Sequence, residues 1–480
     1  MLLVLCGRLT QMLIAFLAIK LATTFLSPAA YGQVSLLLSL ILGFGFFLVN
    51  PVGLFINRRI CSWYAADKIS EYFLIYAVYL LVICVIAIMM IIILQNSIGL
   101  VNGIAVGWII LIVCFSLFFN TANQTFIPFL NLFRFLWSFV WLTLATVISS
   151  LVFSAVFVCY IAPRAEYWQF GQVLGQAVFA IIGAIVFFKL LHIRLKSFKL
   201  VKPSRSMVNT LVAFSLPLLI FATLNWTQQQ VYRFFVSKML GLEALGLFVA
   251  GYSVSAQILA AFENILITCF TPFFYRRIAS GRHEDYIIAW RHYARIVFPV
   301  LFLTVGFLII FAEPITRILT GSQFHVAYRY VLYGALADAC RVTVNTYAYL
   351  AQAQMRTARL IFPGIIGCLV VFILIVLLVA SLKLIGVGLA LVCAGVAAVL
   401  TAHCVLRRQI KIQLPWKALL AALFFIGVLW ILFYSMQYWY KLPVSIISNI
   451  VMMGIFGIIY LVFLYCLIKK PLKYQYEKST

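Results

Sequence analysis

Acidic residues, and charges of either sign, are scarce in this chain. Only 9% of its 480 residues are charged, and ten Asp and Glu stand against 35 Lys and Arg. A soluble domain carries about 25% charged residues, so this chain lacks the side chains needed to cover a water-facing surface. Because 66% of the residues are hydrophobic, the composition indicates an integral membrane protein.

Cysteine motifs are also missing. The eleven cysteines are scattered, mostly inside apolar runs, and none forms a CxxC pair or a zinc-ligand spacing. The sequence therefore predicts neither a disulfide framework nor a metal site. We expect these side chains to pack as small apolar groups.

The net charge of +25 raises the question of an anionic partner. Binding to nucleic acid would call for basic residues gathered in one domain, whereas here they are dispersed between apolar runs. That dispersion is typical of positive-inside topology, in which Lys and Arg mark the cytoplasmic loops. We expect no nucleic-acid partner, and we expect some of the cations to face an anionic substrate.

Long apolar runs dominate the chain. A bilayer core takes about 20 residues of helix, and the connection between the runs at 360–381 and 384–406 is so short that it predicts a tight helical hairpin. The sequence predicts an all-α polytopic membrane protein with about fourteen transmembrane helices. The expected spans are 2–25, 33–56, 72–95, 101–120, 139–162, 169–191, 209–232, 245–271, 294–312, 327–350, 360–381, 384–406, 416–436 and 445–468.

The basic residues orient these spans. With the N-terminus inside, Lys and Arg concentrate in the cytoplasmic connections, most densely over residues 189–205. We therefore predict a multi-pass membrane protein with both termini cytoplasmic.

A weak internal repeat divides the predicted spans. The first copy has LSPAAYGQVSLLLSL (26–40) before INRRI (56–60), and the second has LGLEALGLFVAGYSV (240–254) before FYRRI (274–278). Six spans separate the copies, so the repeats run parallel about an axis normal to the membrane, with substrate expected between them. The predicted domains are a first six-helix bundle at 1–191, a basic cytoplasmic linker at 192–208, a second six-helix bundle at 209–407, and two additional helices with a basic tail at 408–480.

The chain resembles a Wzx-type polysaccharide or oligosaccharide flippase of the multidrug/oligosaccharidyl-lipid/polysaccharide exporter superfamily. The segments that carry the resemblance are LSPAAYGQ after the first span, NPVGLFINRRI (50–60), FSLPLLI (214–220) and RFFVSKMLGLEALGLFVAGYS (233–253). Members often have Asp before the Arg that matches Arg233, and here Tyr232 stands in that place.

This resemblance implies a function, a set of partners and a location in the bacterial cytoplasmic (inner) membrane. A flippase of this kind moves a polyprenyl-diphosphate-linked oligosaccharide from the cytoplasmic to the outer leaflet for O-antigen, capsule or exopolysaccharide assembly, by alternating access around a basic central cavity. The implied partners are the lipid-linked glycan, membrane lipids, a polymerase and other polysaccharide-assembly proteins. The lipid II flippase branch uses its last two of fourteen spans as a lipid groove, which suggests a role for the two additional helices here.

Polar residues on the tenth expected span form a stripe on one helix face. Asp338, Arg341, Asn345, Tyr349 and Gln352 recur at spacings of three and four residues, so they share that face. In one interpretation Asp338 and Arg341 only neutralise each other in a helix interface. In the other, the stripe lines a cavity in which Arg341 meets the diphosphate and Asp338 tunes it or takes a coupling ion.

Two further groups are candidates in the seventh and eighth spans. Asn225, Gln228, Gln229 and Arg233 cluster near the outer end of the seventh span, where they could bind sugar hydroxyls or where Arg233 could anchor the helix at the interface. Glu263 in the eighth span is an isolated acid. It could pair with a cation on another helix, couple transport to H⁺ or Na⁺, or remain neutral and structural.

The first span carries two cations, although a charge near a helix centre is costly in a bilayer. Arg8 with Gln11 forms one polar edge, and Lys20 with Thr23 and Thr24 forms another. We expect one of these edges to face the substrate path, with Arg8 equally suited to anchoring at the cytoplasmic interface. No catalytic residue, metal or cofactor is expected, apart from H⁺ or Na⁺ as a coupling ion.

Two other functions remain open. A membrane enzyme such as an O-antigen polymerase or polyprenyl-linked glycosyltransferase would be expected to show a large outside loop or a DxD motif, and the sequence has no DxD. A small-molecule antiporter of the same superfamily fits the basic candidates poorly when its substrates are cationic drugs.

Overall fold

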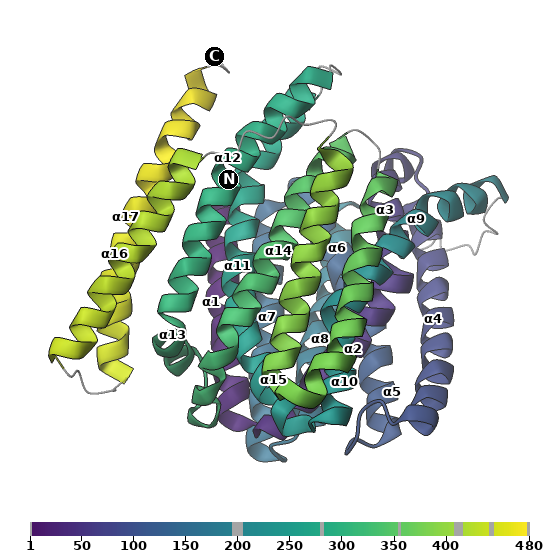
Figure 1. Cartoon of the computed structure of the whole chain (residues 1–480). Coiled ribbons are helices and arrows are strands. Elements are labelled where there is room, and N and C mark those ends of the chain that lie inside the picture. The colour runs from purple at the N-terminus through teal and green to yellow at the C-terminus, as the bar shows by residue number, and fades with distance from the viewer. Residues whose placement is uncertain are drawn as a thin grey trace. The chain divides into compact units, whose positions relative to one another are not determined.

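The computed structural model describes residues 2–193, 205–278, 283–353, 357–407, 416–440 and 446–477. Helices make up almost all of these residues, and no strand occurs among them (Figure 1). The predicted all-α class is therefore confirmed. Most of the predicted basic linker (192–208) and part of the predicted C-terminal region lie outside the described residues.

The chain forms two compact units, Met1–Gly246 and Leu247–Thr480, which we call unit 1 and unit 2. The elements of unit 1 are α1 (Leu2–Phe25), α2 (Pro28–Phe44), η1 (Gly45–Val49), α3 (Asn50–Ala65), α4 (Ile69–Ile98), α5 (Val106–Phe115), η2 (Ser116–Asn120), α6 (Thr121–Leu132), α7 (Leu136–Tyr160), α8 (Ala165–Leu190), α9 (Arg205–Gln230), α10 (Tyr232–Met239) and the start of α11 (Leu242–Ile278). Those of unit 2 are the rest of α11, α12 (His283–Ile310), α13 (Ala312–Leu319), η4 (Ser322–Ala327), α14 (Tyr328–Ala353), η5 (Thr357–Leu360), α15 (Ile361–Leu406), α16 (Trp416–Tyr440) and α17 (Ile446–Glu477). The division into six-helix bundles stays a prediction.

Two π-helical turns, η1 and η2, interrupt apolar helices of unit 1. In η1 the Asn50 N–H donates to the Gly45 carbonyl, five residues back, and Pro51 follows without an N–H to continue the regular pattern. Such turns leave carbonyl groups without their usual helical partner. Within η1, the Leu48 carbonyl accepts a hydrogen bond of 2.7 Å from the Tyr79 hydroxyl.

Two glycines allow α2 and the first turn of α11 to cross at very close range. A Cβ on Gly32 would collide with the carbonyl oxygen of Leu242, and one on Gly246 with that of Pro28. Each glycine thus meets the residue four positions before the other glycine, which makes the contact reciprocal. Gly32 and Gly246 are also the matching glycines of the two sequence repeats, so at this point the repeats meet symmetrically.

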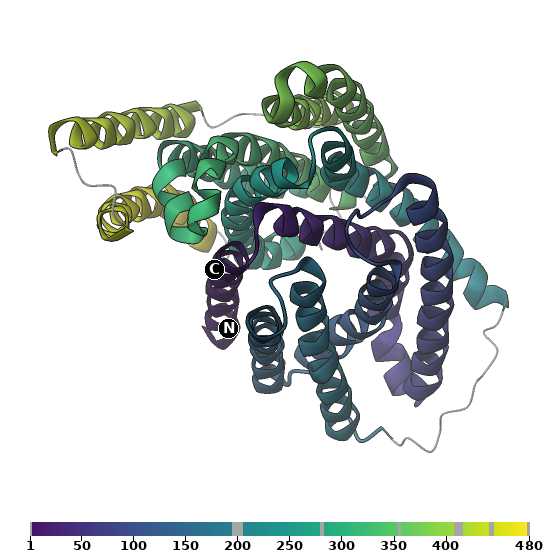
Figure 2. The ribbon, with the colours of Figure 1, turned by 90° about the horizontal axis from the view of Figure 1, so that it is seen from below.

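Helix α15 is a helical hairpin. Lys383 interrupts it with a non-helical conformation (φ 50°, ψ −129°), and Gly386 lies against the backbone of Leu378. In an unbroken helix these residues would be about 12 Å apart along the axis. The chain therefore reverses at Lys383, and Figure 2 shows the two arms of α15 side by side. The predicted tight hairpin is confirmed.

The last two helices pack within unit 2 through aromatic rings. Phe311, between α12 and α13, lies 4.8 Å from Phe433 of α16 and 5.1 Å from Phe456 of α17, measured between ring centroids. The hydroxyls of Thr304 and Tyr460 share a buried hydrogen bond of 2.7 Å. These contacts fix α16 and α17 against α12 and α13.

Eleven described helices are long and apolar enough to cross a membrane, which shows a multi-pass membrane protein. Three features separate this number from the expected fourteen. The two arms of α15 enter this number as one span although the chain reverses between them, α14 is too polar to qualify, and the described side chains of α17 cover only Ile450–Tyr465 of its apolar run. The count of fourteen stays a prediction.

Candidate functional site

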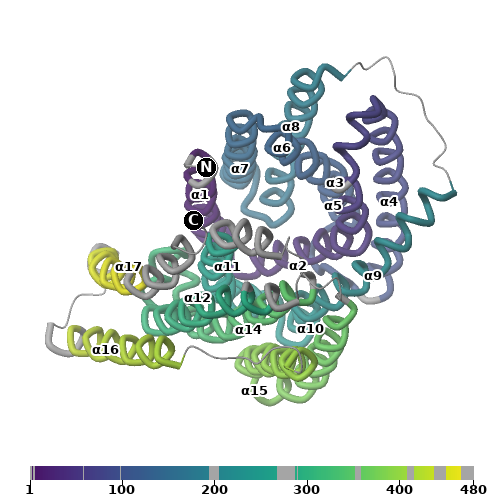
Figure 3. The backbone as a smooth tube through the Cα atoms, turned by 90° about the horizontal axis from the view of Figure 1, so that it is seen from above, coloured from purple at the N-terminus to yellow at the C-terminus, as the bar shows by residue number. Residues whose placement is uncertain are grey.

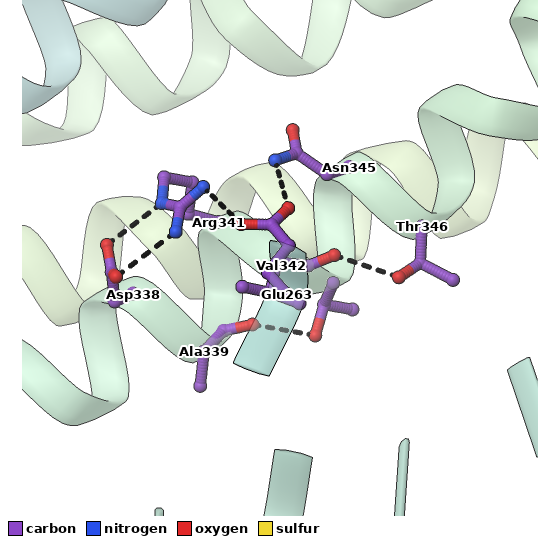
Figure 4. Close-up of polar contacts among 8 residues, drawn as sticks. Glu263, Asp338, Ala339, Arg341, Val342, Asn345 and Thr346 are labelled. Atoms are coloured by element: carbon purple, nitrogen blue, oxygen red, sulfur yellow. Dashed lines mark hydrogen bonds and ion pairs between the residues drawn. The ribbon is translucent and has the colours of Figure 1, made fainter. Parts of the chain in front are cut away.

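A buried charged cluster joins α11 and α14 in unit 2. The Arg341 guanidinium donates from Nε to Asp338 Oδ1 at 2.9 Å and from Nη2 to Oδ2 at 3.2 Å. Its Nη1 donates to Glu263 Oε2 at 2.8 Å. Figure 4 shows the guanidinium between the two carboxylates. Asn345 completes the cluster by donating from Nδ2 to Glu263 Oε1 at 2.8 Å.

Helix geometry and burial explain how the cluster forms. Asp338, Arg341 and Asn345 follow one another at three- and four-residue spacing on α14, so one face presents all of them to Glu263 on α11. The side chains of Asp338 and Glu263 are only 6% and 11% exposed. A buried carboxylate needs a cation or hydrogen-bond donors, and Arg341 serves both acids.

The formal charges of this cluster do not cancel. Two carboxylates face one guanidinium, which leaves one negative charge in excess when all three groups are ionised. Bound H⁺ or Na⁺, or a further cation, would balance it. In this arrangement Arg341 reaches an anion only if one of its present pairs opens.

The structure brings together four residues that the sequence singled out in this half: Glu263, Asp338, Arg341 and Asn345. The expected pairing of Asp338 with Arg341 is present, and Glu263 has the cationic partner on another helix that was one of its three interpretations. Tyr349, from the same stripe, packs edge-on against Tyr293. The side chain of Gln352 lies outside the described residues.

In unit 1, Arg233 is attached to α2. Its Nη1 donates to the Ser35 carbonyl at 3.1 Å and to the Ser39 hydroxyl at 3.2 Å. Its Nε donates to the hydroxyl of Tyr232 at 3.4 Å, the residue that stands where related chains often have Asp. Among the described residues no carboxylate pairs with Arg233.

The amides near Arg233 have different surroundings. Asn225 donates to the Phe221 carbonyl of its own helix, whereas Gln228 and Gln229 are half-buried on α9. Two residues that sequence reasoning missed are built into the site. Gln230 accepts from the Ser39 hydroxyl at 3.2 Å, and the Trp226 indole N–H donates to the Ser39 carbonyl at 2.9 Å. Both residues lie in the polar segment 225–233, which is the sequence feature that could have indicated them.

The cations of the first span lie on two separate edges of α1. Arg8 is exposed, donates to Gln11 Oε1 at 3.0 Å, and has its guanidinium 6.0 Å from the Phe139 ring. The Thr24 hydroxyl donates to the Lys20 carbonyl at 2.7 Å, and Lys20 itself is half-buried. The role of Arg8 and Lys20 in substrate binding stays a prediction.

Solved structures with the same fold belong to one class of membrane transporter. One is the lipid II flippase MurJ in an inward closed conformation, with a TM-score of 0.65, 15% identity, and coverage of 98% of this chain and 99% of that chain. Multidrug resistance MATE family transporters of the MOP superfamily match in inward-facing (TM-score 0.63, 16% identity, 83% and 94% coverage) and outward-facing conformations (0.55, 16%, 84% and 94%).

The family follows from the sequence match. The model of the family described as polysaccharide biosynthesis protein matches residues 1–276, more than half of the chain, and the chain belongs to this family. The expected relationship to a polysaccharide family is therefore confirmed, and the fold is the one seen in MurJ and in MATE transporters. No curated protein sequence matches the chain.

Proposed function

We propose that the protein is a flippase that moves a polyprenyl-diphosphate-linked oligosaccharide from the cytoplasmic to the outer leaflet of the bacterial inner membrane. The observation that carries the proposal is a set of charged and amide side chains inside apolar helices of a polysaccharide biosynthesis family member. Charged groups within a membrane protein are costly and commonly mark a path for polar substrates.

The substrate has three chemically different parts: a diphosphate, a glycan and a polyprenyl tail. The chain offers polar groups for the first two. Arg233, whose charge no described carboxylate neutralises, suits the diphosphate. Amide and hydroxyl groups suit the sugars. The polyprenyl tail needs no polar partner and can remain in the bilayer. The assembled glycan would be an O-antigen, a capsule or an exopolysaccharide.

Alternating access is the proposed mechanism. The same fold occurs in both inward-facing and outward-facing MATE transporters, which supports two alternating conformations for this chain as well. The excess carboxylate of the Glu263–Asp338–Arg341 cluster would take up H⁺ or Na⁺. Binding of the ion would then weaken one pair with Arg341 and free part of the guanidinium for an anion.

The direct test is a leaflet-accessibility assay with the full chain reconstituted in liposomes. A polyprenyl diphosphate bearing a short fluorescent oligosaccharide is placed in both leaflets, and a membrane-impermeant quencher reports the fraction that can be reached from outside. We expect the quenched fraction to rise from about half toward completion in protein-containing vesicles, with a rate that responds to H⁺ or Na⁺ gradients.

The controls separate the competing functions. Protein-free vesicles give the spontaneous rate, and a protein preparation that adds nothing to it would contradict the flippase proposal. Mass spectrometry of the recovered lipid checks for an enzyme, because a polymerase or glycosyltransferase would lengthen the glycan. Faster exchange of a cationic drug than of the lipid would instead favour a small-molecule antiporter.

A further inference from the structure

Unit 1 contains a polar cavity that none of the expected site residues lines. Its volume is about 460 Å³, and the helices around the two π-helical turns η1 and η2 supply most of its wall. Small-molecule pockets commonly measure about 300–1,000 Å³, so this space can hold a ligand larger than a few waters. Figure 3 shows α4, which supplies Tyr76 to the lining, beside α5 in this unit.

The polar side chains described around this cavity are amides and hydroxyls. Four amides face it, Asn50 and Asn57 from α3, Asn120 from η2 and Gln124 from α6. The hydroxyl-bearing residues Tyr76, Ser116, Thr121 and Thr125 also line it. None of the sixteen described residues in its lining is charged. We call this space the amide cavity.

Several of these amides have hydrogen-bonding capacity to spare. The side chains of Asn50 and Asn57 are exposed and have no hydrogen-bond partner among the described residues. Gln124 donates from Nε2 to Asn120 Oδ1 at 3.1 Å, which leaves the Asn120 N–H groups and the Gln124 carbonyl oxygen available. The described part of the lining thus offers donors and acceptors together and carries no charged side chain.

This chemistry selects one class of ligand. A carboxamide presents two donors and an acceptor, and a sugar hydroxyl is both a donor and an acceptor, so each can satisfy the other. A diphosphate needs cations for its charge, and the described lining residues include none. An apolar tail would leave the amides without partners, at a cost in desolvation.

We infer that the amide cavity binds an uncharged, hydroxyl-bearing sugar of the lipid-linked oligosaccharide. This inference rests on the proposed flippase function and adds to it separate binding groups for two parts of the substrate. Basic residues hold the diphosphate, while the amides of α3, η2 and α6 recognise the neutral glycan and so contribute to substrate selection.

The test measures the affinity of the full chain in lipid nanodiscs for two lipids. One is a polyprenyl diphosphate carrying a disaccharide of neutral hexoses, and the other is the same polyprenyl diphosphate without sugar. Wild-type protein should bind the sugar-bearing lipid about tenfold or more tightly, the difference expected from two or more neutral hydrogen bonds.

Two double variants remove the sugar contacts in different ways. Asn120→Leu with Gln124→Leu deletes the paired amides, and Asn50→Ala with Asn57→Ala deletes the unpaired ones, whose loss breaks no described contact. Both should lose most of the tenfold advantage while keeping wild-type affinity for the sugarless lipid. The matched control is Asn131→Leu, an exposed amide on α6 outside the cavity, which should keep the advantage.

The results distinguish this inference from the function on which it rests. Equal wild-type affinity for the two lipids, or full retention of the advantage in both double variants, would overturn the sugar site and leave the flippase proposal standing. If wild-type protein bound neither lipid, the flippase proposal itself would fail. Thermal unfolding of each variant verifies that the affinities refer to folded protein.

Discussion

At the scale of single residues, the Arg341 pairs should differ in energy from an ordinary surface ion pair. Arg341→Ala leaves two largely buried carboxylates without their cation, and breaking such a pair typically costs about 3–5 kcal/mol. The matched control is Arg317→Ala. Arg317 pairs with Glu313 at 2.8 Å, but that carboxylate side chain is 42% exposed, so about 0–1 kcal/mol should be lost. Unfolding in detergent compares the two, and equal losses would contradict the prediction.

A triple variant without charges in this cluster tests whether the charges are needed for stability or for transport. Replacing Glu263 with Gln, Asp338 with Asn and Arg341 with Gln removes both carboxylates and the guanidinium together, so no uncompensated charge stays buried. This triple variant should recover most of the stability lost in Arg341→Ala and still fail in the leaflet assay. A stable triple variant that transports at the wild-type rate would reduce the cluster to helix packing.

The sequence indicated only one of the two ion pairs in this cluster, the one between Asp338 and Arg341. The i, i+3 spacing indicates that Asp338 and Arg341 can meet, because helix geometry is local. The partner of Glu263 is 78 positions away in sequence, and no local rule selects it among the chain's cations. The same limit applies to Arg233, whose contacts with Ser35 and Ser39 cross nearly 200 residues.

At the scale of helices, the crossing of α2 with α11 depends on the absence of two side chains. Close approach through small residues is a general means of packing membrane helices, and here a single Cβ would overlap a backbone carbonyl. Gly32→Ala and Gly246→Ala should each destabilise the protein by about 1–3 kcal/mol, as overpacking does. The midpoint of thermal unfolding measures this.

Another helical glycine provides the control for this crossing. Nothing lies within 4 Å of a Cβ built on Gly107 of α5, so Gly107→Ala should be neutral or should stabilise by up to about 1 kcal/mol through its higher helix propensity. If all three substitutions behaved alike, the close crossing would not matter for stability. The repeat in the sequence identified both glycines as matching positions, but not that they touch.

At the scale of the whole molecule, α14 and the reversal at Lys383 decide the topology. If α14 crosses the membrane and the arms of α15 cross separately, Gln323 and Lys383 lie outside and Arg359 lies inside. Cysteines placed singly at these positions, in a chain whose eleven native cysteines are replaced, should react with an impermeant maleimide at Gln323 and Lys383 and be protected at Arg359. Labelling of Arg359→Cys from outside would contradict fourteen spans.

The polarity of α14 explains why this helix is missing from the eleven apolar spans, although the sequence predicts a span at 327–350. Its charged and amide stripe lowers the mean hydropathy below that of a lipid-facing span. Those polar groups are satisfied by one another and by Glu263, so the helix does not need to expose them to lipid. The charged and amide residues of such a site therefore give α14 a composition closer to that of a helix in a soluble protein.

The sequence by itself determined the all-helical membrane class, the hairpin at Lys383, the polysaccharide-exporter relationship and the identity of the polar residues on α14. These follow from local patterns, because apolar run length, helix periodicity and turn position depend on neighbouring residues. Only the tertiary structure decided that Glu263 joins Arg341, that Arg233 attaches to α2, and that four amides from three elements surround one cavity. Contacts between distant segments depend on how whole helices pack, which no short stretch of sequence encodes.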